Sequence, residues 1–393
     1  MAENKEKKVL NVPNLRFPEF EGEWDETKLK EISKFSKERL NSIELSCSNY
    51  VTTENMLQDY KGIVSATNLP TNTNVVKFSK GDVLLSNIRP YLKKVWYADK
   101  NGGCSADVFV FKALPICNSN FLHHVIANDR FIKFVMGGAK GVKMPRGDKE
   151  QMITYKVGLP CIEEQKKIAT LLSLLDKRIS TQNKIIEDLK KLKSAIIDYA
   201  IGSLDTNFMK FGSVYETAGE GGTPTTSNTS FYDNGKIPFI KIGDLKQKYL
   251  IGNKDFITEL GLQKSSAWLV PTHSILFSNG ATIGEITITT YPVCTKQGIL
   301  GIVPKANIDV EFLYYFMSSS YFKKAVSRII TEGTMKTAYL KDIDNILCPI
   351  PTKEKQLEIA KVPSALNFKI DSEQSILRLL YAQKQYLLHQ MFI

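Results

Sequence analysis

The sequence lacks the long apolar runs and paired cysteines that mark membrane and secreted proteins. No stretch of its 393 residues approaches the roughly 20 apolar residues that span a bilayer. The N-terminal MAENKEKKVL has no apolar core of the kind found in signal peptides. The six cysteines are scattered without a C-x-x-C pair, which favours buried thiols over a disulfide frame or a zinc site. We therefore expect a cytoplasmic protein that neither spans a membrane nor needs one as a partner.

Motifs that carry catalysis are missing as well. There is no G-x-x-x-x-G-K-[ST] for ATP hydrolysis, no G-x-G-x-x-G after a strand, and no Pro-Pro from which an amino-methyltransferase signature could be built. The D-x-K triplet at Asp244–Lys246 is a pattern that arises by chance. His123-His124, His273 and His389 have no partner at metal-ligand spacing. The sequence therefore predicts no catalytic residue, no metal ligand and no cofactor of its own.

The first informative feature that the sequence does have is its net positive charge. The formal net charge is +11, while 43% hydrophobic and 24% charged residues are ordinary for a folded chain. The length leaves room for two or more domains. A basic chain of this size favours a polyanionic partner, either nucleic acid or a membrane surface.

The most regular stretch is residues 159–202, which reads as one long helix. Pro160 precedes it and Gly202 follows it, a start and a stop signal. Apolar side chains recur at steps of three and four, which predicts a single seam. The seam residues are Ile168, Leu172, Leu175, Ile179, Ile186, Leu189, Leu192, Ile196 and Tyr199.

The same stretch occurs again 191 residues later. The polar lead-in Pro-x-x-Glu-x-Gln-x-x-Ile-Ala of Pro160–Ala169 returns at Pro351–Ala360. The seam then continues with shared Ser, Leu, Ile and Lys positions. These are Ser173/Ser364, Leu175/Leu366, Ile179/Ile370, Ile185/Ile376, Leu189/Leu380 and Lys193/Lys384. Two unrelated amphipathic helices are the alternative, but they would not share the polar lead-in.

The segments before the two helices follow one order. In the first half we expect strands at 83–86, 94–98 and 108–112 and a helix over 120–138. In the second half, β-like runs precede a helix over 311–329, and Ser86-Asn87 matches Ser278-Asn279. The sequence predicts an α/β (α+β) fold in which a domain and a long helix occur in tandem. The segments are 1–159 (first domain with an N-terminal arm), 160–202 (first long helix), 203–350 (second domain) and 351–393 (second long helix).

The two long helices can bury their seams most simply on each other, as an antiparallel coiled coil. About 38 helical residues span roughly 57 Å. Gln182 and Glu373 fall on the seam, where they either fix the register or turn to its edge. Pro363 replaces Leu172 of the first copy, so the second helix either begins near Val362 or is kinked.

The tandem arrangement resembles the specificity subunit of type I restriction–modification systems. The repeated lead-in carries the resemblance, together with Gly221-Gly222-Thr223-Pro224, the segment 231–240 and the proline before each long helix. The resemblance implies two target-recognition domains, each reading half of a split double-stranded DNA site. It also implies that the helices set the spacer and dock two methyltransferase subunits, through which restriction (nuclease and translocase) subunits join. S-adenosylmethionine, ATP and magnesium would then belong to the partners.

Polar side chains in turns between strands are the candidates for reading DNA, because Arg pairs with guanine, Asn pairs with adenine and Lys mostly contacts phosphate. In the first domain they are Ser86, Asn87, Arg89, Tyr91, Lys93, Lys94, Lys140, Lys143 and Arg146. In the second they are Thr223, Thr225, Lys241, Ser278, Asn279, Thr282, Lys296, Gln297, Thr334 and Lys336. A solvated loop side chain is the alternative for each of them.

These observations predict a non-catalytic, sequence-specific DNA-binding subunit that directs partner enzymes. On this hypothesis, Arg89→Ala or Asn279→Ala relaxes one half of the recognised sequence. The alternative is a coiled-coil adaptor that holds two protein partners without binding DNA.

Overall fold

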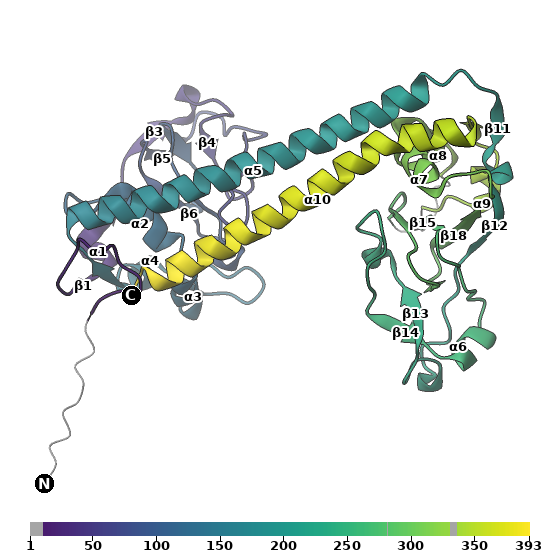
Figure 1. Cartoon of the computed structure of the whole chain (residues 1–393). Helices are drawn as coiled ribbons and strands as arrows, with labels where there is room; N and C mark the ends of the chain where they lie inside the picture. Colours follow the sequence, from purple (N-terminus) through teal and green to yellow (C-terminus); the bar gives the residue numbers. More distant parts are fainter. Residues whose placement is uncertain (1–10, 281, 331–335) are drawn as a thin grey trace, which may run out of the picture. The chain divides into compact units, whose positions relative to one another are not determined.

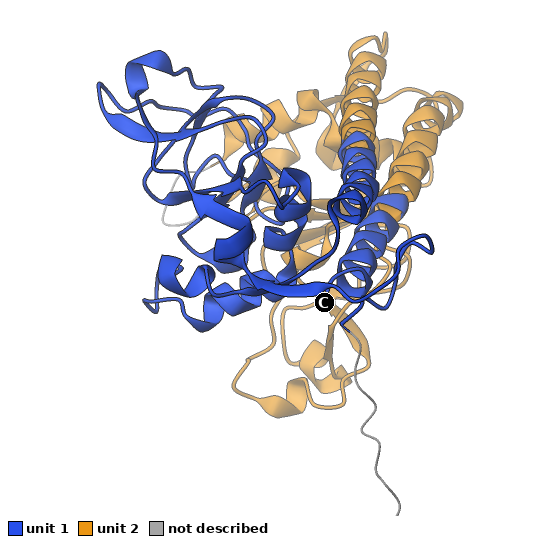
Figure 2. Cartoon of the chain, turned by 90° about the vertical axis from the view of Figure 1, so that its left-hand side faces the viewer, with its two compact units in different colours: residues 1–183, 376–393 blue, residues 184–375 orange. Residues whose placement is uncertain are grey.

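The protein forms two compact units in a computed structural model that describes residues 11–280, 282–330 and 336–393. One unit comprises Met1–Asn183 and Ile376–Ile393, and the other comprises Lys184–Ser375 (Figure 2). Each unit therefore joins one globular domain to one end of each long helix. The predicted four-segment division stays a prediction, because the boundaries between the units cut through both helices.

Antiparallel strand pairing dominates the first unit. One four-stranded sheet has the order β2-β9-β6-β7, a second has the order β3-β5-β8-β4, and β1 pairs with β10. The strands are β1 (Asp25–Lys28), β2 (Ser33–Phe35), β3 (Arg39–Asn41), β4 (Tyr50–Val51), β5 (Asn74–Phe78), β6 (Val83–Ser86), β7 (Val95–Tyr97), β8 (Gly102–Cys104), β9 (Val108–Ala113) and β10 (Lys156–Leu159). The helices are α1 (Leu29–Ile32), α2 (Ser119–Ile126), α3 (Asp129–Gly137), α4 (Lys149–Met152) and the first part of α5 (Ile162–Gly202).

The second unit repeats this plan with a smaller second sheet. Its four-stranded sheet has the order β12-β18-β15-β16, its second sheet is β14-β13-β17, and β11 pairs with β19. The strands are β11 (Phe208–Lys210), β12 (Tyr215–Glu220), β13 (Ile237–Ile240), β14 (Asp255–Ile257), β15 (Ile275–Ser278), β16 (Ile286–Ile288), β17 (Cys294–Thr295), β18 (Ile299–Pro304) and β19 (Leu347–Pro349). The helices are α6 (Glu259–Gln263), α7 (Val310–Ser318), α8 (Ser320–Ile329), α9 (Leu340–Ile343) and the first part of α10 (Lys353–Gln390) (Figure 1).

Each unit builds its main core between the first four-stranded sheet and a pair of short helices. In the first unit Leu85 and Phe111 of the sheet share a buried cluster with Phe121 of α2. In the second unit Phe277 and Ile302 occupy the equivalent cluster with Phe312 and its neighbours on α7. The alternation of apolar side chains in these strands places one face on the helices. The predicted tandem α+β fold is confirmed.

The predicted strands are confirmed, but each predicted domain helix is two helices. The strands at 83–86, 94–98 and 108–112 correspond to β6, β7 and β9. The helix expected over 120–138 breaks between α2 and α3, where the Asn128 side chain caps α3 by accepting from Arg130 N. The helix expected over 311–329 breaks at Ser319, whose hydroxyl accepts from Phe322 N. Asn and Ser favour such caps over helix interiors, and this outweighs the continuous apolar period.

The glutamine of the repeated lead-in fastens each long helix to its domain. Gln165 Oε1 accepts from Asn118 N at 2.8 Å, and its amide nitrogen donates to the Pro160 and Ile116 carbonyls at 2.9 and 3.1 Å. Gln356 makes the equivalent bonds to Asp309 N, the Pro351 carbonyl and the Asn307 carbonyl at 2.8, 2.9 and 3.2 Å. Both glutamines are 1% exposed. Paired buried polar groups of this kind fix the helix start against the loop before α2 or α7.

The two long helices run antiparallel within each unit. In the first unit Leu175 and Ile179 of α5 pack with Leu380 of α10, and Asp176 pairs with Lys384. In the second unit the ammonium of Lys193 donates to Asn367 Oδ1 at 2.8 Å. Higher numbers on α5 thus face lower numbers on α10. No described helix combines the length and apolarity that a membrane crossing requires.

The long helices depart from the prediction at two places, the exposed seam residues of α5 and the start of α10. Leu192 and Tyr199 are 49% and 79% exposed, while Ile197 and Ile201 are buried instead. A period of 3.6 residues drifts away from a strict heptad, so the buried face moves around α5. Gln182 and Glu373 are buried at 8% and 7% exposure, which favours a seam position over a turn to the edge. The helix α10 begins at Lys353 and runs through Pro363, so the expectation of a start near Val362 is wrong.

Candidate nucleic-acid interface

The turn after β6 presents the first group of predicted residues. It carries a short 3-10 helix, Pro90–Leu92, between Arg89 and Lys93, whose φ values are +51° and +54°. Residues other than glycine seldom adopt this left-handed conformation, so surrounding contacts must hold it. One such contact is the bond from Arg89 N to the Pro145 carbonyl at 2.8 Å. The turn is therefore a fixed structure that presents the exposed Arg89 and Tyr91 side chains.

The loop between α3 and α4 joins this turn to form one surface. Lys140 and Arg146 exchange two backbone hydrogen bonds of 2.9 Å, which close the loop as a small hairpin. Gly147 N donates to the Asn87 carbonyl at 3.2 Å, and Ile88 forms an isolated antiparallel β-bridge with Arg146. The sequence predicted two separate basic turns, and the structure brings them together.

The cations on this surface differ in their partners. Lys93 pairs with Asp129 at 2.8 Å, Lys140 with Asp148 at 2.7 Å and Arg146 with Asp107 at 3.5 Å. The Lys94 ammonium donates to the Thr53 carbonyl at 2.6 Å. Within the described residues, the side chains of Arg89 and Lys143 make no ion pair or hydrogen bond. These two cations are the ones best placed to meet an incoming anion.

An equivalent surface lies in the second unit. Asn279 N donates to the Gly298 carbonyl at 3.0 Å, and Ala338 N donates to the Asn279 carbonyl at 2.9 Å. Gln297 N lies 3.5 Å from the Thr223 hydroxyl. The turn after β15, the turn before β18, the Gly-rich loop and the segment at 336–338 therefore meet, and the side chains of Lys296, Gln297 and Lys336 are exposed there.

The repeated Ser-Asn pair is a structural joint in both units. Ser86 and Ser278 are 1% and 0% exposed, and their hydroxyls donate to the Ile88 and Thr282 carbonyls. The Asn279 amide nitrogen donates to the Ala338 carbonyl at 3.3 Å, and this side chain is 1% exposed. Asn87 is half-buried at the matching place. These four residues position the turns, whereas their exposed neighbours can reach a ligand.

Three further candidates of the second domain lie on these segments or directly beside them, since Lys296 N donates to the Ile240 carbonyl at 2.9 Å. Lys241 follows β13 and pairs with Asp255 at 2.7 Å, which engages its charge. Thr225 and Thr282 are exposed loop residues. Thr334 lies outside the described residues. Base reading by the individual residues stays a prediction.

Sequence reasoning missed Val142, at the tip of the hairpin formed by residues 140–146. Its side chain is fully exposed, and Met144 in the same hairpin is 47% exposed. An apolar side chain between Lys140 and Lys143, in a turn flanked by glycine and proline, is the signal that could have identified it. Apolar contacts of this kind suit the thymine methyl group in the major groove.

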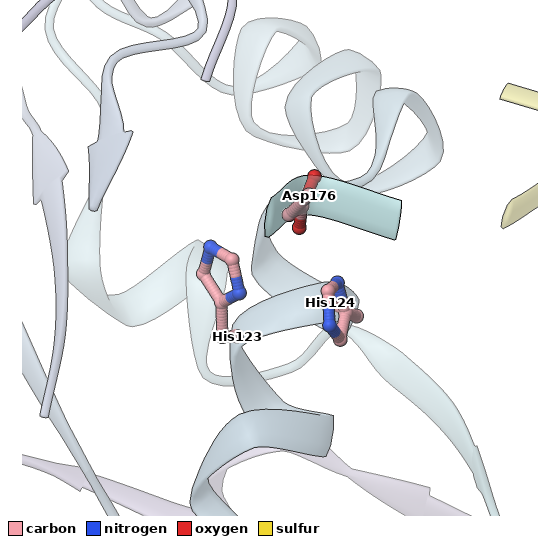
Figure 3. Close-up of side chains that lie close together, drawn as sticks. All are labelled: His123, His124 and Asp176. Atoms are coloured by element: carbon pink, nitrogen blue, oxygen red, sulfur yellow. The ribbon is translucent and has the colours of Figure 1, made fainter. Parts of the chain in front are cut away.

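A second missed arrangement involves the histidines of α2. The structure brings Asp176 of α5 next to His123 and His124, although 52 residues separate it from His124 (176 − 124). Figure 3 shows the three side chains around one point. The sequence spacing offered the pair no partner, because the nearby carboxylate comes from another helix. That the chain has no metal ligand stays a prediction.

Comparison with known proteins decides the family. The model described as "Type I restriction modification DNA specificity domain" matches twice, over residues 21–191 and 204–380. The chain belongs to this family. Its two specificity domains coincide with the repeat found in the sequence, and the predicted family resemblance is confirmed.

Named relatives agree with the family match. A putative type I restriction enzyme MjaX specificity subunit of Methanocaldococcus jannaschii is 28% identical over 240 residues, which cover 56% of this chain and 54% of the relative. The EcoR124I/EcoR124II specificity subunit of Escherichia coli is 25% identical, with 53% and 54% covered. The chain thus spans about half the length of these relatives. The MjaVIII specificity subunit of M. jannaschii is 24% identical, with 91% and 88% covered.

Solved structures share the fold of the tandem specificity domains. The S subunit of a type I restriction–modification system from M. genitalium superposes with a TM-score of 0.62 at 17% identity, covering 97% of this chain and 99% of that one. A chain from a study of type I complex assembly and conformational transition has a TM-score of 0.57 at 18% identity, with 93% and 96% covered. At these identities the likeness shows the fold.

Proposed function

We propose that this chain is the non-catalytic specificity subunit of a type I restriction–modification complex and that each specificity domain reads one half of a bipartite DNA site. The observation that carries the proposal is the repeated surface. In both units the Ser-Asn joint fixes neighbouring turns and leaves polar or cationic side chains exposed beside it. A duplicated reading surface suits a target with two half-sites.

The chemistry of the two surfaces differs. In the first domain Arg89 can pair bidentately with guanine, and Lys143 can neutralise a phosphate. In the second domain Arg328 is the only arginine between Arg178 and Arg378, so base contacts fall to Gln297 and to Lys and Thr side chains. The two halves of the target should therefore differ in sequence.

The long helices supply a surface for partner subunits. On α5, Ile185, Leu192 and Tyr199 recur every seven residues and are 40%, 49% and 79% exposed, which marks one apolar face. On α10, Leu379 and Tyr386 are 70% and 60% exposed at the same spacing. Two methyltransferase subunits would dock helices on these faces, and restriction subunits would join through them. S-adenosylmethionine, ATP and magnesium would belong to those partners, in the cytoplasm.

Mapping modified bases across a host genome tests base reading. With Arg89→Ala in the complex, one position in one half of the modified site should accept other bases, at a cost of about 1–3 kcal/mol for the original base. With Lys143→Ala, binding should weaken for every sequence and the salt slope should fall by about one.

Lys34→Ala provides the control, because Lys34 is an exposed lysine on β2 that lies opposite Lys112, at the end of β9 remote from the turn after β6. This control variant should leave both the base preference and the salt slope unchanged. If Arg89→Ala weakens binding to all sequences alike, this residue does not read a base. If the assembled complex shows no salt-dependent DNA binding at all, the adaptor function is correct and the proposal fails.

A further inference from the structure

The cluster of His123, His124 and Asp176 lies in the first unit, and none of its three side chains is a candidate for reading DNA. One donor atom from each side chain lies within 4.8 Å of the other two. His124 is completely buried, and within the described residues neither of its ring nitrogens makes a hydrogen bond of good geometry, although the Ala169 backbone lies beside the ring. Buried polar atoms nearly always have a partner, so this orphaned ring needs an explanation.

The second specificity domain contains the same site with different side chains. The 191-residue shift places Tyr314, Tyr315 and Asn367 at the positions of His123, His124 and Asp176. A lysine reaches across from the other long helix in both units. Lys384 pairs with Asp176, and Lys193 donates to Asn367 at 2.8 Å. The backbone framework is therefore shared, and the first copy alone carries three side chains that ligate metals.

We propose that His123, His124 and Asp176 bind one divalent transition metal, with zinc as the preferred ion. Imidazole nitrogen and carboxylate oxygen are established zinc ligands, and three protein ligands leave a fourth position open. The ion would join α2 of the first specificity domain to α5, and it would give the orphaned His124 ring a partner.

The surroundings suit such an ion. A cavity of about 620 Å³ reaches the cluster and is lined by His123, Asp176, Tyr97 and Tyr381 among others. This cavity leaves room for a water molecule in the fourth position.

Two adjustments accompany binding. Zinc bonds of about 2.1 Å bring tetrahedral donors to roughly 3.4 Å from one another, so the side chains must rotate inward. The His124 ring can do so without breaking a hydrogen bond of good geometry. Lys384 competes for Asp176, but a carboxylate has two oxygens and can accept both cations. The repulsion between Lys384 and the ion favours micromolar over nanomolar affinity.

Zinc binding to the full chain tests the proposal. Dialysis should give one zinc per chain, and cobalt should give the visible absorption of a tetrahedral site. Asp176→Asn and His123→Tyr install the side chains of the second copy, and each should weaken zinc binding at least tenfold. Asn367→Asp is the matched control, which should leave binding unchanged because Tyr314 and Tyr315 supply no imidazole.

Thermal unfolding with and without zinc separates ligation from misfolding. The ion should raise the Tm of the wild type and of Asn367→Asp, because it binds only the folded state. It should leave the Tm of Asp176→Asn and His123→Tyr unchanged. If zinc does not bind, or binds all four proteins alike, the proposal is overturned. The outcome is independent of DNA recognition, since no residue of the cluster belongs to the reading surface.

Discussion

Glu164 and Lys355 occupy matching places in the repeat, yet only the first is buried. The Glu164 carboxylate is 0% exposed, and its two oxygens accept from the Arg16 guanidinium at 2.8 and 2.7 Å. The Trp24 ring nitrogen lies 3.3 Å from it. Lys355 is exposed and pairs with Glu358 at 2.9 Å. The same helical position is thus buried in one unit and exposed in the other.

At the residue scale we therefore expect opposite outcomes for Glu164→Ala and Lys355→Ala. Removing Glu164 leaves the mostly buried Arg16 without its counter-ion, which should cost about 3 kcal/mol of unfolding free energy in the first unit. Removing Lys355 breaks an exposed pair, which should cost less than about 0.5 kcal/mol. Urea unfolding measures both changes. A similar loss in the two variants would contradict a special role for the buried pair.

At the scale of helices and strands, some features of this fold could be predicted from the sequence and others could not. The seam of α5, the strand at 83–86 and the tandem order were readable because apolar period and repetition are local signals. The breaks at Asn128 and Ser319 were not, because capping competes with a continuous apolar period. The contact between the turn after β6 and the hairpin formed by residues 140–146 could not be predicted. Its backbone bonds join residues 56 (Arg89 and Pro145) and 60 (Asn87 and Gly147) positions apart, and such bonds leave no periodic pattern in the sequence. Asp176 was missed for the same reason.

A buried charge network joins α7 to α10 in the second unit. Lys248 is 3% exposed at its side chain and pairs with Glu311 at 2.9 Å. Glu311 also accepts from the hydroxyls of Ser364 and Tyr249. Burial alone would raise the pKa of Glu311, but these hydrogen bonds and Lys248 outweigh burial and hold the pKa below its usual value. The first unit has a neutral counterpart, in which Asn120 donates to Ser173 at 2.6 Å.

At the element scale this network predicts acid sensitivity of the second unit. A carboxyl whose pKa is lower in the folded state stabilises the fold above its unfolded pKa of about 4.5, and that contribution is lost as the pH falls below it. Glu311→Gln should lower the urea midpoint at about pH 7 and flatten its decline toward about pH 3. Asn120→Ala in the first unit should shift the midpoint equally at both pH values. Parallel pH curves for Glu311→Gln and the wild type would refute the role of this carboxyl.

At the scale of the whole molecule, duplication gives one chain two copies of the surface that we propose reads DNA, each on a domain with its own core. Sites without shared partners should act additively. The buried Asn279 holds its turn together, so Gln297 is the better choice for testing base reading in the second domain. We expect Arg89→Ala to reduce preference for one half-site and Gln297→Ala to reduce preference for the other, each by about 1–3 kcal/mol. The double variant should lose the sum of the two, within about 0.5 kcal/mol.

Competition binding by the assembled complex measures this additivity, using the mapped target and versions with either half scrambled. Arg89→Ala should leave discrimination at the second half-site intact, and Gln297→Ala should leave discrimination at the first intact. Asn279→Ala serves as the contrast, because loss of its bond to Ala338 should disturb the second turn as a whole and weaken all contacts of that domain. A coupling free energy well above about 0.5 kcal/mol between Arg89 and Gln297 would mean that binding at one surface depends on the other. Independent reading by the two domains would then be wrong, even with both of them bound to DNA.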